Sequence, residues 1–236
     1  MTEKLIWVVV PAAGVGSRLK SAGPKQYIQI GGRTLLDHTL SVLLDHPRVA
    51  GAVVAVSSTD QHWENSAYAN HSNIRVVDGG VERCDSVMNG LRYLHEQEKV
   101  EGAVMVHDAA RPCLQAQDID ALIDVGAQSA SGAILAVPVK DTLKQVGTNH
   151  EILRTVDRSE LWHALTPQLF PIEGLIAALD SANSQGMVVT DEASAMEQAG
   201  VTPLIVPGLA TNLKVTVAED LLLTEAILIS QGRIAL

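Results

Sequence analysis

The chain has 236 residues, of which 17 are Lys or Arg and 27 are Asp or Glu, so its formal net charge is −10. This acidic balance argues against non-specific binding to nucleic acid or to an anionic membrane, although a local basic site remains possible. The two cysteines, Cys84 and Cys113, provide neither a disulfide framework nor a zinc quartet. A chain of this length can bury a full core, and we expect a single domain over residues 1–236.

Apolar strand-like runs alternate with amphipathic helical segments along the chain. The expected strands cover residues 5–10, 52–57, 74–77, 103–106, 133–139 and 203–206. The expected helices begin near Thr34 and Asp85 and recur at residues 119–125, 174–182, 192–198 and 218–229. This repetition predicts an α/β fold, a Rossmann-like three-layer sandwich in which helices cover both faces of a mainly parallel, twisted sheet.

The segment from Lys140 to Arg158 breaks this alternation. It is polar, with strand-like arms at residues 142–146 and 152–156 and the turn residues Gly147-Thr148-Asn149 between them. Neither arm carries enough apolar surface for a central strand, so we expect a hairpin arm at about residues 139–158 that projects from the domain. Such a hairpin is marginal alone and needs a partner surface. A solvated edge hairpin is the alternative.

The first predicted strand runs into a glycine-containing loop, PAAGVGSR, with the cations Arg18 and Lys25 behind it. Free backbone N–H groups and nearby cations suit a polyphosphate. The loop is not a Walker A motif, and Leu19 stands where the dinucleotide fingerprint requires a third small residue. Because a Gly-Pro turn separates the two cations, they can approach one triphosphate from different sides. A solvated basic loop is the alternative interpretation.

The amino-terminal apolar run loosely resembles a signal peptide, because Lys4 precedes it and Ala12-Ala13 follow it. The run is short, however, and the turn chemistry after it fits a folded domain better. No stretch of the sequence approaches the roughly 20 apolar residues of a membrane span. We therefore expect a cytoplasmic protein.

Polar residues also end two later apolar runs. VVDGG places Asp78, and VMVHDAARP places Asp108 and Arg111, at the carboxyl ends of predicted strands. That edge is where open α/β sheets bind ligands. An aspartate there can hold a hydroxyl group or Mg²⁺, and an arginine can bind a phosphate.

Two further motifs and one histidine allow more than one interpretation. The motif TDEAS (Thr190–Ser194) is either a helix N-cap or a polar contact with substrate. In NLKVT, Lys214 lies in a short strand-like run, where a lysine points outward unless a site uses it. His107 beside Asp108 invites a catalytic dyad, which we disfavour because no G-x-S-x-G nucleophile elbow is nearby.

Taken together, these stretches resemble the 2-C-methyl-D-erythritol 4-phosphate cytidylyltransferase family. The motifs PAAGVGSR, PKQY, VDGG-x-ER-x-DSV, HDAARP, PVKDT with TVDR, TPQ, TDEASA and NLKVT follow one another from Pro11 to Thr216. The resemblance implies a nucleotide-diphosphosugar transferase fold, a homodimer and Mg²⁺ bound mainly through the CTP phosphates. It also implies the reaction, in which methylerythritol phosphate and CTP give the CDP-alcohol and pyrophosphate in non-mevalonate isoprenoid synthesis.

The family pattern implies a role for each matching position. Arg18 and Lys25 would stabilise the transition state on the CTP phosphates, and Arg158 and Lys214 would complete the catalytic set. The implied nucleotide-binding positions are Pro11, Ala12, Ala13, Gly14, Gly16, Asp78, Gly80, Ser86 and Ala109. The implied acceptor-binding positions are Asp108, Arg111, Thr142 and Thr190. Thr142 and Arg158, on the hairpin, would reach the neighbouring subunit's site. Thr211 departs from the Asp that is frequent in relatives, which leaves the detail near Lys214 open.

Three other functions share parts of this pattern. A ribitol phosphate cytidylyltransferase has many of the same motifs, and only acceptor assays separate it cleanly. An NAD-dependent oxidoreductase shares the fold class but needs the fingerprint that this loop lacks. A non-catalytic nucleotide-binding regulator would keep the glycine loop without needing Arg18, Lys25, Asp108 and Lys214 together.

Overall fold

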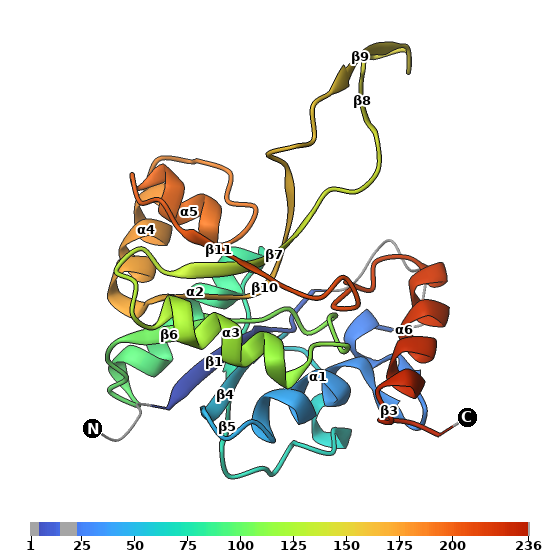
Figure 1. Ribbon diagram of the computed structural model, residues 1–236. Helices are drawn as coiled ribbons and strands as arrows, with labels where there is room; N and C mark the ends of the chain where they lie inside the picture. The colour runs from blue at the N-terminus through green and yellow to red at the C-terminus, as the bar shows by residue number, and fades with distance from the viewer. Residues whose placement is uncertain (1–4, 15–22, 236) are drawn as a thin grey trace.

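The computed structural model describes residues 5–14 and 23–235, so Gly16 and Arg18 of the expected site lie outside the described residues. A seven-stranded sheet forms its centre (Figure 1). Its strands, in spatial order, are β11 (Leu204–Pro207), β7 (Ala133–Pro138), β10 (Trp162–Pro171), β6 (Ala103–Val106), β1 (Ile6–Pro11), β4 (Val49–Val56) and β5 (Ile74–Asp78). The strands pair in parallel except β10, which runs antiparallel to both β6 and β7.

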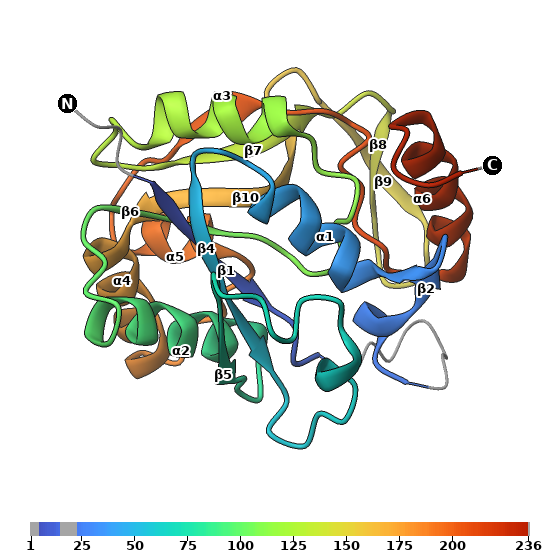
Figure 2. The same ribbon diagram turned by 90° about the horizontal axis from the view of Figure 1, so that it is seen from below.

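Helices cover both faces of this sheet (Figure 2). On one face lie α1 (Leu35–Leu44) and α3 (Ala116–Gly126), which pack against β4 and against β7, β10 and β11 respectively. On the other lie α2 (Arg83–Glu96), α4 (Ile172–Ser184) and α5 (Glu192–Gln198), which pack on one another and on β1, β4, β5 and β10. The three-layer α/β arrangement expected from the sequence is therefore confirmed.

The first strand shows why its sequence is apolar without interruption. Val8 and Val10 belong to the core beneath α1 and α3, whereas Val9 belongs to the core beneath α2 and α4. All three side chains are fully buried. A central parallel strand with helices on both faces has no solvent side, so alternation of polar and apolar residues disappears.

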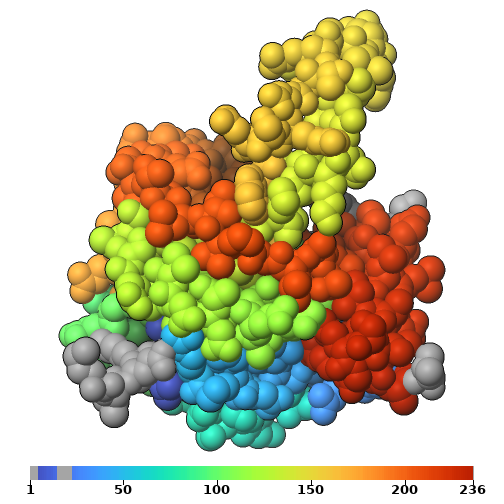
Figure 3. All heavy atoms as spheres, viewed as in Figure 1, coloured from blue at the N-terminus to red at the C-terminus, as the bar shows by residue number. Residues whose placement is uncertain are grey.

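The segment after β7 forms a separate two-stranded sheet, β8 (Leu143–Val146) and β9 (Ile152–Val156), as the sequence predicts. The β8–β9 hairpin stands clear of the body in both the ribbon and the space-filling views (Figures 1 and 3). Val146, Ile152 and Leu153 on it are 51%, 64% and 58% exposed, so the hairpin has no core of its own. Its part in dimerisation, like the single-domain organisation, remains a prediction.

Shorter elements complete the described chain. They are the 3-10 turns η1 (Lys25–Tyr27) and η2 (Trp63–Asn65), the small ladder of β2 (Gln29–Ile30) with β3 (Arg33–Thr34), and the last helix α6 (Ala218–Ser230). A third apolar cluster joins β2 and α1 to α6 through Ile30, Leu35 and Leu228. No helix among the described residues is both long and apolar enough to cross a bilayer.

Two segments differ from the sequence-based expectations. Strand β10 has no counterpart among the expected strands, because its first three residues are exposed and Thr166, Pro167 and Gln168 interrupt its apolar run. Residues 212–216, expected to be strand-like, form no strand. Their backbone is instead satisfied by other partners: Val215 donates its N–H to Ala110 O at 2.8 Å and accepts from Lys25 Nζ at 3.2 Å.

Candidate active site

A pocket opens at the carboxyl ends of β1 and β6, between the loop after β1 and the start of α2. Its empty volume, which includes space open to solvent, is about 650 Å³. We call it the loop pocket. It is lined by Pro11, Ala12, Ala13, Gly14, Lys25, Gln26, Gly80, Val81, Glu82, Arg83, Ser86, Asp108, Ala109, Ala110 and Lys214. Ten of the sequence-predicted site residues are in this lining, although they come from five separate stretches of the chain.

The described part of the loop after β1 is held from beneath. Gln26, which is buried in η1, donates a side-chain hydrogen bond to Ala12 O. On the other side Gly79 packs against the Cβ of Ala13, a contact that leaves no room for a side chain at position 79. Lys25 is fixed to the far wall through its bond to Val215 O. Residues 12 and 13 are therefore held in place by contacts within the chain.

Two glycines of the pocket differ in what they require. A Cβ on Gly80 would meet the Cβ of Asp85 at less than contact distance, whereas a Cβ on Gly14 would have no atom of the described residues within 4 Å. Gly80 also donates its N–H to Ser86 Oγ at 3.0 Å, which links the loop after β5 to the first turn of α2. Packing within the described part of the chain therefore explains Gly80 but gives no such reason for Gly14.

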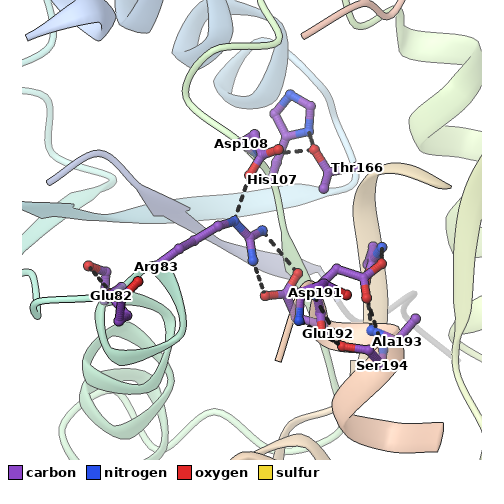
Figure 4. Close-up of polar contacts among 12 residues, drawn as sticks. Glu82, Arg83, His107, Asp108, Thr166, Asp191, Glu192, Ala193 and Ser194 are labelled. Atoms are coloured by element: carbon purple, nitrogen blue, oxygen red, sulfur yellow. Dashed lines mark hydrogen bonds and ion pairs between the residues drawn. The ribbon is translucent and has the colours of Figure 1, made fainter. Parts of the chain in front are cut away.

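The floor of the pocket is an ion cluster around Asp108 (Figure 4). Arg83 Nε lies 2.8 Å from Asp108 Oδ1, while Lys214 Nζ at 2.8 Å and Arg111 Nε at 3.6 Å face Oδ2. Burial would raise the pKa of Asp108, but the charges of Arg83, Lys214 and Arg111 outweigh it and hold that pKa far below its ordinary range. Asp108 is therefore an anion throughout the working pH range.

A second carboxylate anchors the same cluster. Glu192, the first residue of α5, is 1% exposed and accepts two hydrogen bonds from Arg83, at 2.7 Å and 3.1 Å (Figure 4). Burial would lower the pKa of the Arg83 guanidinium, but Glu192 and Asp108 raise it above its ordinary value. Three cations thus face two carboxylates, so the cluster keeps one net positive charge at the base of the pocket.

A second pocket, which we call the β10 pocket, adjoins the first and shares Arg83, Asp108 and Lys214 with it. Its remaining lining is Arg111, Ala164, Leu165, Thr166, Gln168, Thr190 and Asp191. Strand β10 shifts register between Ala164 and Gln168 as it passes the pocket, an irregularity of the kind found beside active sites. Asn212 supports this stretch by donating to Thr166 O at 2.8 Å.

The structure also distinguishes between the two interpretations of TDEAS. Asp191 is the N-cap of α5, with its side chain accepting from Ser194 N at 3.0 Å, and it is held by Gln168 Nε2 at 2.8 Å. Thr190 lies just before the cap, is exposed, and lines the β10 pocket. The motif therefore contains both a helix cap and a pocket residue.

The two pockets gather most of the predicted site residues but not all. Pro11, Ala12, Ala13, Gly14, Lys25, Gly80, Ser86, Asp108, Ala109 and Lys214 line the loop pocket, and Arg111 and Thr190 line the β10 pocket. Asp78 is the exposed last residue of the edge strand β5 and lines neither pocket. Thr142 and Arg158 are exposed at the base of the hairpin, outside both pockets.

Several residues of the site were not predicted from the sequence. Arg83, Glu192, Thr166 and Gln168 stand inside the motifs VDGG-x-ER-x-DSV, TDEASA and TPQ, so their positions were visible. Their pairing was not, because the ion pair between Arg83 and Glu192 joins residues 109 positions apart. Gln26 was likewise hidden, since only the fold brings it under the loop after β1.

Comparison with known proteins agrees with this geometry. A family model described as 2-C-methyl-D-erythritol 4-phosphate cytidylyltransferase matches residues 6–230. Proteins of that name from Vibrio vulnificus (strain CMCP6) and Pseudomonas fluorescens (strain Pf0-1) are 52% and 50% identical to this chain, over 92% and 91% of it and 92% of each relative.

Solved structures give the same result. The 2-C-methyl-D-erythritol 4-phosphate cytidylyltransferase from Francisella tularensis superposes with a TM-score of 0.82 at 38% identity, covering 95% of this chain and 100% of that one. The enzyme of the same name from Thermus thermophilus superposes with a TM-score of 0.78 at 30% identity, covering 94% and 98%. The chain belongs to the 2-C-methyl-D-erythritol 4-phosphate cytidylyltransferase family.

Proposed function

We propose that the two adjoining pockets hold the two substrates of the family's reaction, CTP in the loop pocket and methylerythritol phosphate in the β10 pocket. The enzyme transfers a cytidylyl group from CTP to 2-C-methyl-D-erythritol 4-phosphate and releases pyrophosphate, a step of isoprenoid precursor synthesis. The observation that carries the assignment of pockets is their common wall. Arg83, Asp108 and Lys214 belong to both, so two ligands placed there would meet at this ion cluster.

The chemistry follows from charge. The acceptor phosphate is itself the nucleophile and is largely ionised at neutral pH, because the second pKa of a phosphate monoester is about 6. No strong general base is therefore needed. What opposes reaction is the repulsion between two polyanions, so the enzyme must align them and neutralise the charge that develops on the leaving pyrophosphate.

The cations of the site suit this task. Lys25 lies beside the loop after β1, and we assign it, with Arg18, to the triphosphate. Lys214 is fixed by Asp108 at 2.8 Å on the common wall, where it can hold the acceptor phosphate in line with the α-phosphorus of CTP. Arg111 is fixed by its bond to Asn212 O at 2.8 Å and supplies a further charge on the acceptor side.

Magnesium fits this site through the nucleotide and not through a protein cage. Both carboxylate oxygens of Asp108 face cations, and among residues 5–14 and 23–235 no group of three or more His, Cys, Asp or Glu side chains could hold a metal ion. Mg²⁺ commonly binds the phosphates of a nucleotide and keeps several waters. When bound in this way it supplies charge neutralisation on the phosphates.

The base would be read by the loop after β5. Ser86 and the backbone of Gly80 are joined by a hydrogen bond of 3.0 Å and line the loop pocket, where they can pair with the edge of a cytosine. Small, pre-positioned polar groups discriminate strongly because the wrong base leaves them unpaired. This supports a preference for CTP over UTP, ATP and GTP.

We further propose a homodimer in which the β8–β9 hairpin completes the partner's site. Two observations support it: the hairpin exposes Val146, Ile152 and Leu153 without a core, and Thr142 and Arg158 line neither of the two pockets of their own chain. A symmetric dimer would bury the first set and bring the second to the neighbouring β10 pocket.

The test of the substrate assignment is pyrophosphate release from CTP with a panel of acceptor phosphates. Methylerythritol phosphate should give turnover, and ribitol phosphate should not. Release with ribitol phosphate alone would instead identify a ribitol phosphate cytidylyltransferase, the nearest alternative among enzymes that share these motifs.

A further inference from the structure

The family reaction as derived above makes no use of His107, although this side chain is fully buried directly beneath the site. Its Nδ1 lies 3.0 Å from Thr166 Oγ1 (Figure 4), and its Nε2 lies 3.2 Å from Arg111 O. The residue that follows it, Asp108, donates its backbone N–H to the same Thr166 Oγ1 at 3.0 Å. A histidine, a threonine hydroxyl and the Asp108 amide thus form one chain of hydrogen bonds.

The direction of each bond in this chain is fixed by the carbonyl at one end. Arg111 O can only accept, so the proton on the imidazole must be on Nε2. Burial lowers the pKa of His107 to about 4, so the ring is neutral at working pH and Nδ1 carries a lone pair. The Thr166 hydroxyl must then donate its only proton to Nδ1, while it accepts from the Asp108 N–H.

This leaves Thr166 with one unused lone pair and no proton. Thr166 lines the β10 pocket together with Arg111, Thr190 and Lys214. A hydroxyl side chain normally donates or accepts as its ligand requires. Here its hydrogen is already committed to a buried partner, so towards the pocket it is an acceptor only.

We propose that His107 is a positioning residue for acceptor specificity: it orients the Thr166 hydroxyl so that this oxygen accepts a hydrogen bond from a hydroxyl group of the polyol. The proposal rests on the assignment of the β10 pocket to the acceptor. A phosphate dianion offers no proton, so Thr166 would repel it, whereas the neighbouring cations Arg111 and Lys214 attract it. The pocket is therefore divided into a cationic part for the phosphate and an accepting oxygen for the polyol.

Fluorinated substrates test the sense of this hydrogen bond. Each of the three free hydroxyl groups of methylerythritol phosphate is replaced in turn by hydrogen or by fluorine, and kcat/KM is measured with CTP. Fluorine accepts hydrogen bonds weakly and cannot donate one. At the position whose hydroxyl normally donates to Thr166, the fluorine lone pairs therefore face the lone pair of Thr166 Oγ1 and repel it. There the fluoro analogue should be roughly tenfold worse than the deoxy analogue, the scale expected for an unsatisfied polar contact. Equal kcat/KM for fluoro and deoxy analogues at all three positions would overturn the proposal.

Two substitutions separate orientation from packing. His107→Phe keeps the ring but removes the acceptor of the Thr166 proton, so the hydroxyl becomes free to donate and the fluoro penalty should vanish. His107→Asn places an amide oxygen near the Nδ1 position and should retain the penalty, although it packs less well. If His107→Phe does not fold, Thr166→Val shows whether Thr166 is the contact that the fluorine opposes, and the nitrogen-15 measurement on His107 tests the orientation. A penalty that persists in a folded His107→Phe or Thr166→Val protein would contradict the assignment.

A measurement that needs no substrate gives an independent test. In protein labelled with nitrogen-15 on histidine, His107 should show a protonated Nε2 and an unprotonated Nδ1 at pH 7. This result would hold even if the acceptor were a different phosphate, so it separates the failure of this inference from the failure of the substrate assignment. A protonated Nδ1 would overturn the inference, because the Thr166 hydroxyl would then keep its proton for the pocket.

Discussion

The ion cluster around Asp108 and the β8–β9 hairpin are built on opposite principles. Asp108 and Glu192 are almost completely buried; Asp108 faces three cations at 2.8–3.6 Å, and Glu192 pairs with Arg83 at 2.7 Å. The hairpin is held by its own ladder and by exposed bonds such as Lys144 Nζ to Thr155 Oγ1 at 2.7 Å, and its apolar side chains face outward. The charges of the cluster are paired within the chain, whereas the apolar side chains of the hairpin are left exposed by it.

This difference predicts where the protein is rigid and where it would rely on the proposed partner subunit. A buried charge cluster keeps its geometry because every displacement leaves a charge unpaired at high cost. An isolated two-stranded hairpin has no such constraint and is at best marginally stable in water. We infer that the nucleotide side of the site is pre-formed in each subunit and that assembly supplies the part carried by the hairpin.

The largest effect is expected at Lys25. Lys25→Ala should lower kcat by roughly 10²–10³-fold, by analogy with the removal of one preorganised donor from a charge-stabilising site. The fold should survive, because Lys25 packs in no apolar core. Lys99→Ala is the matched control, since Lys99 is exposed at the end of the sheet opposite the pocket. Steady-state pyrophosphate release measures both variants, and turnover of folded Lys25→Ala equal to that of Lys99→Ala would refute the role.

The next effect concerns stability and compares two arginines of the same helix. Arg83→Ala leaves the buried carboxylates of Asp108 and Glu192 short of a partner, so the free energy of unfolding should fall by about 3 kcal/mol. Arg92 pairs with Asp180 at 2.7 Å, but both side chains are about half exposed, and Arg92→Ala should cost less than about 1 kcal/mol. Urea unfolding at pH 7 gives both numbers. Equal losses of unfolding free energy in the two variants would mean that the buried Asp108 cluster stabilises the fold no more than an exposed ion pair does.

The buried histidine predicts a pH dependence of stability. The unfolded chain takes up a proton on this residue below its ordinary pKa of 6.5, whereas the folded chain does so only near its lowered pKa of about 4. Because the unfolded state binds more protons in that window, the contribution of His107 to the free energy of unfolding falls as pH falls, by about 1.4 kcal/mol per unit. Urea unfolding of wild type and His107→Phe between pH 7 and 4 should show a shallower slope in the variant. Equal slopes of unfolding free energy against pH in the two proteins would mean that a group other than His107 takes up the proton on unfolding.

The smallest effect on folding is expected in the hairpin. Replacing Ile152 and Leu153 together by Ser should change the unfolding free energy of the monomer by no more than about 0.5 kcal/mol, because both side chains are mostly exposed. The same change should weaken the dimer, as sedimentation equilibrium would show. A large loss of monomer stability would mean that the hairpin packs on its own body.

The sequence predicts the parts of this molecule that are local. The apolar runs that lie between helical segments locate six strands of the main sheet. Helix α5 begins and ends at the expected residues. The polar character of residues 140–158 identifies the hairpin. Glycines and acidic residues at strand ends identify the pocket, because carboxyl ends of parallel strands share one edge.

What the sequence leaves out depends on contacts between distant residues. The apolar run of strand β10 is interrupted by Thr166, Pro167 and Gln168, and its pairing with β6 and β7 makes it a strand. From the sequence, Glu192 is predicted only to begin a helix. Its ion pair with Arg83 depends on the tertiary fold. The proton arrangement of His107 needs both Thr166 and Arg111 in place, and no local pattern contains all three.

The central claim, that the hairpin of one subunit completes the site of the other, is tested most directly by mixing two defective homodimers. Lys25→Ala damages the loop pocket of its own chain, and Arg158→Ala damages the hairpin. After co-unfolding and refolding, about half of the dimers should be heterodimers if assortment is random. In a shared site, one active site of each heterodimer collects both defects and the other collects neither, so activity should return to about a quarter of wild type. No recovery, with heterodimers confirmed by native mass spectrometry, would show that Arg158 serves its own chain.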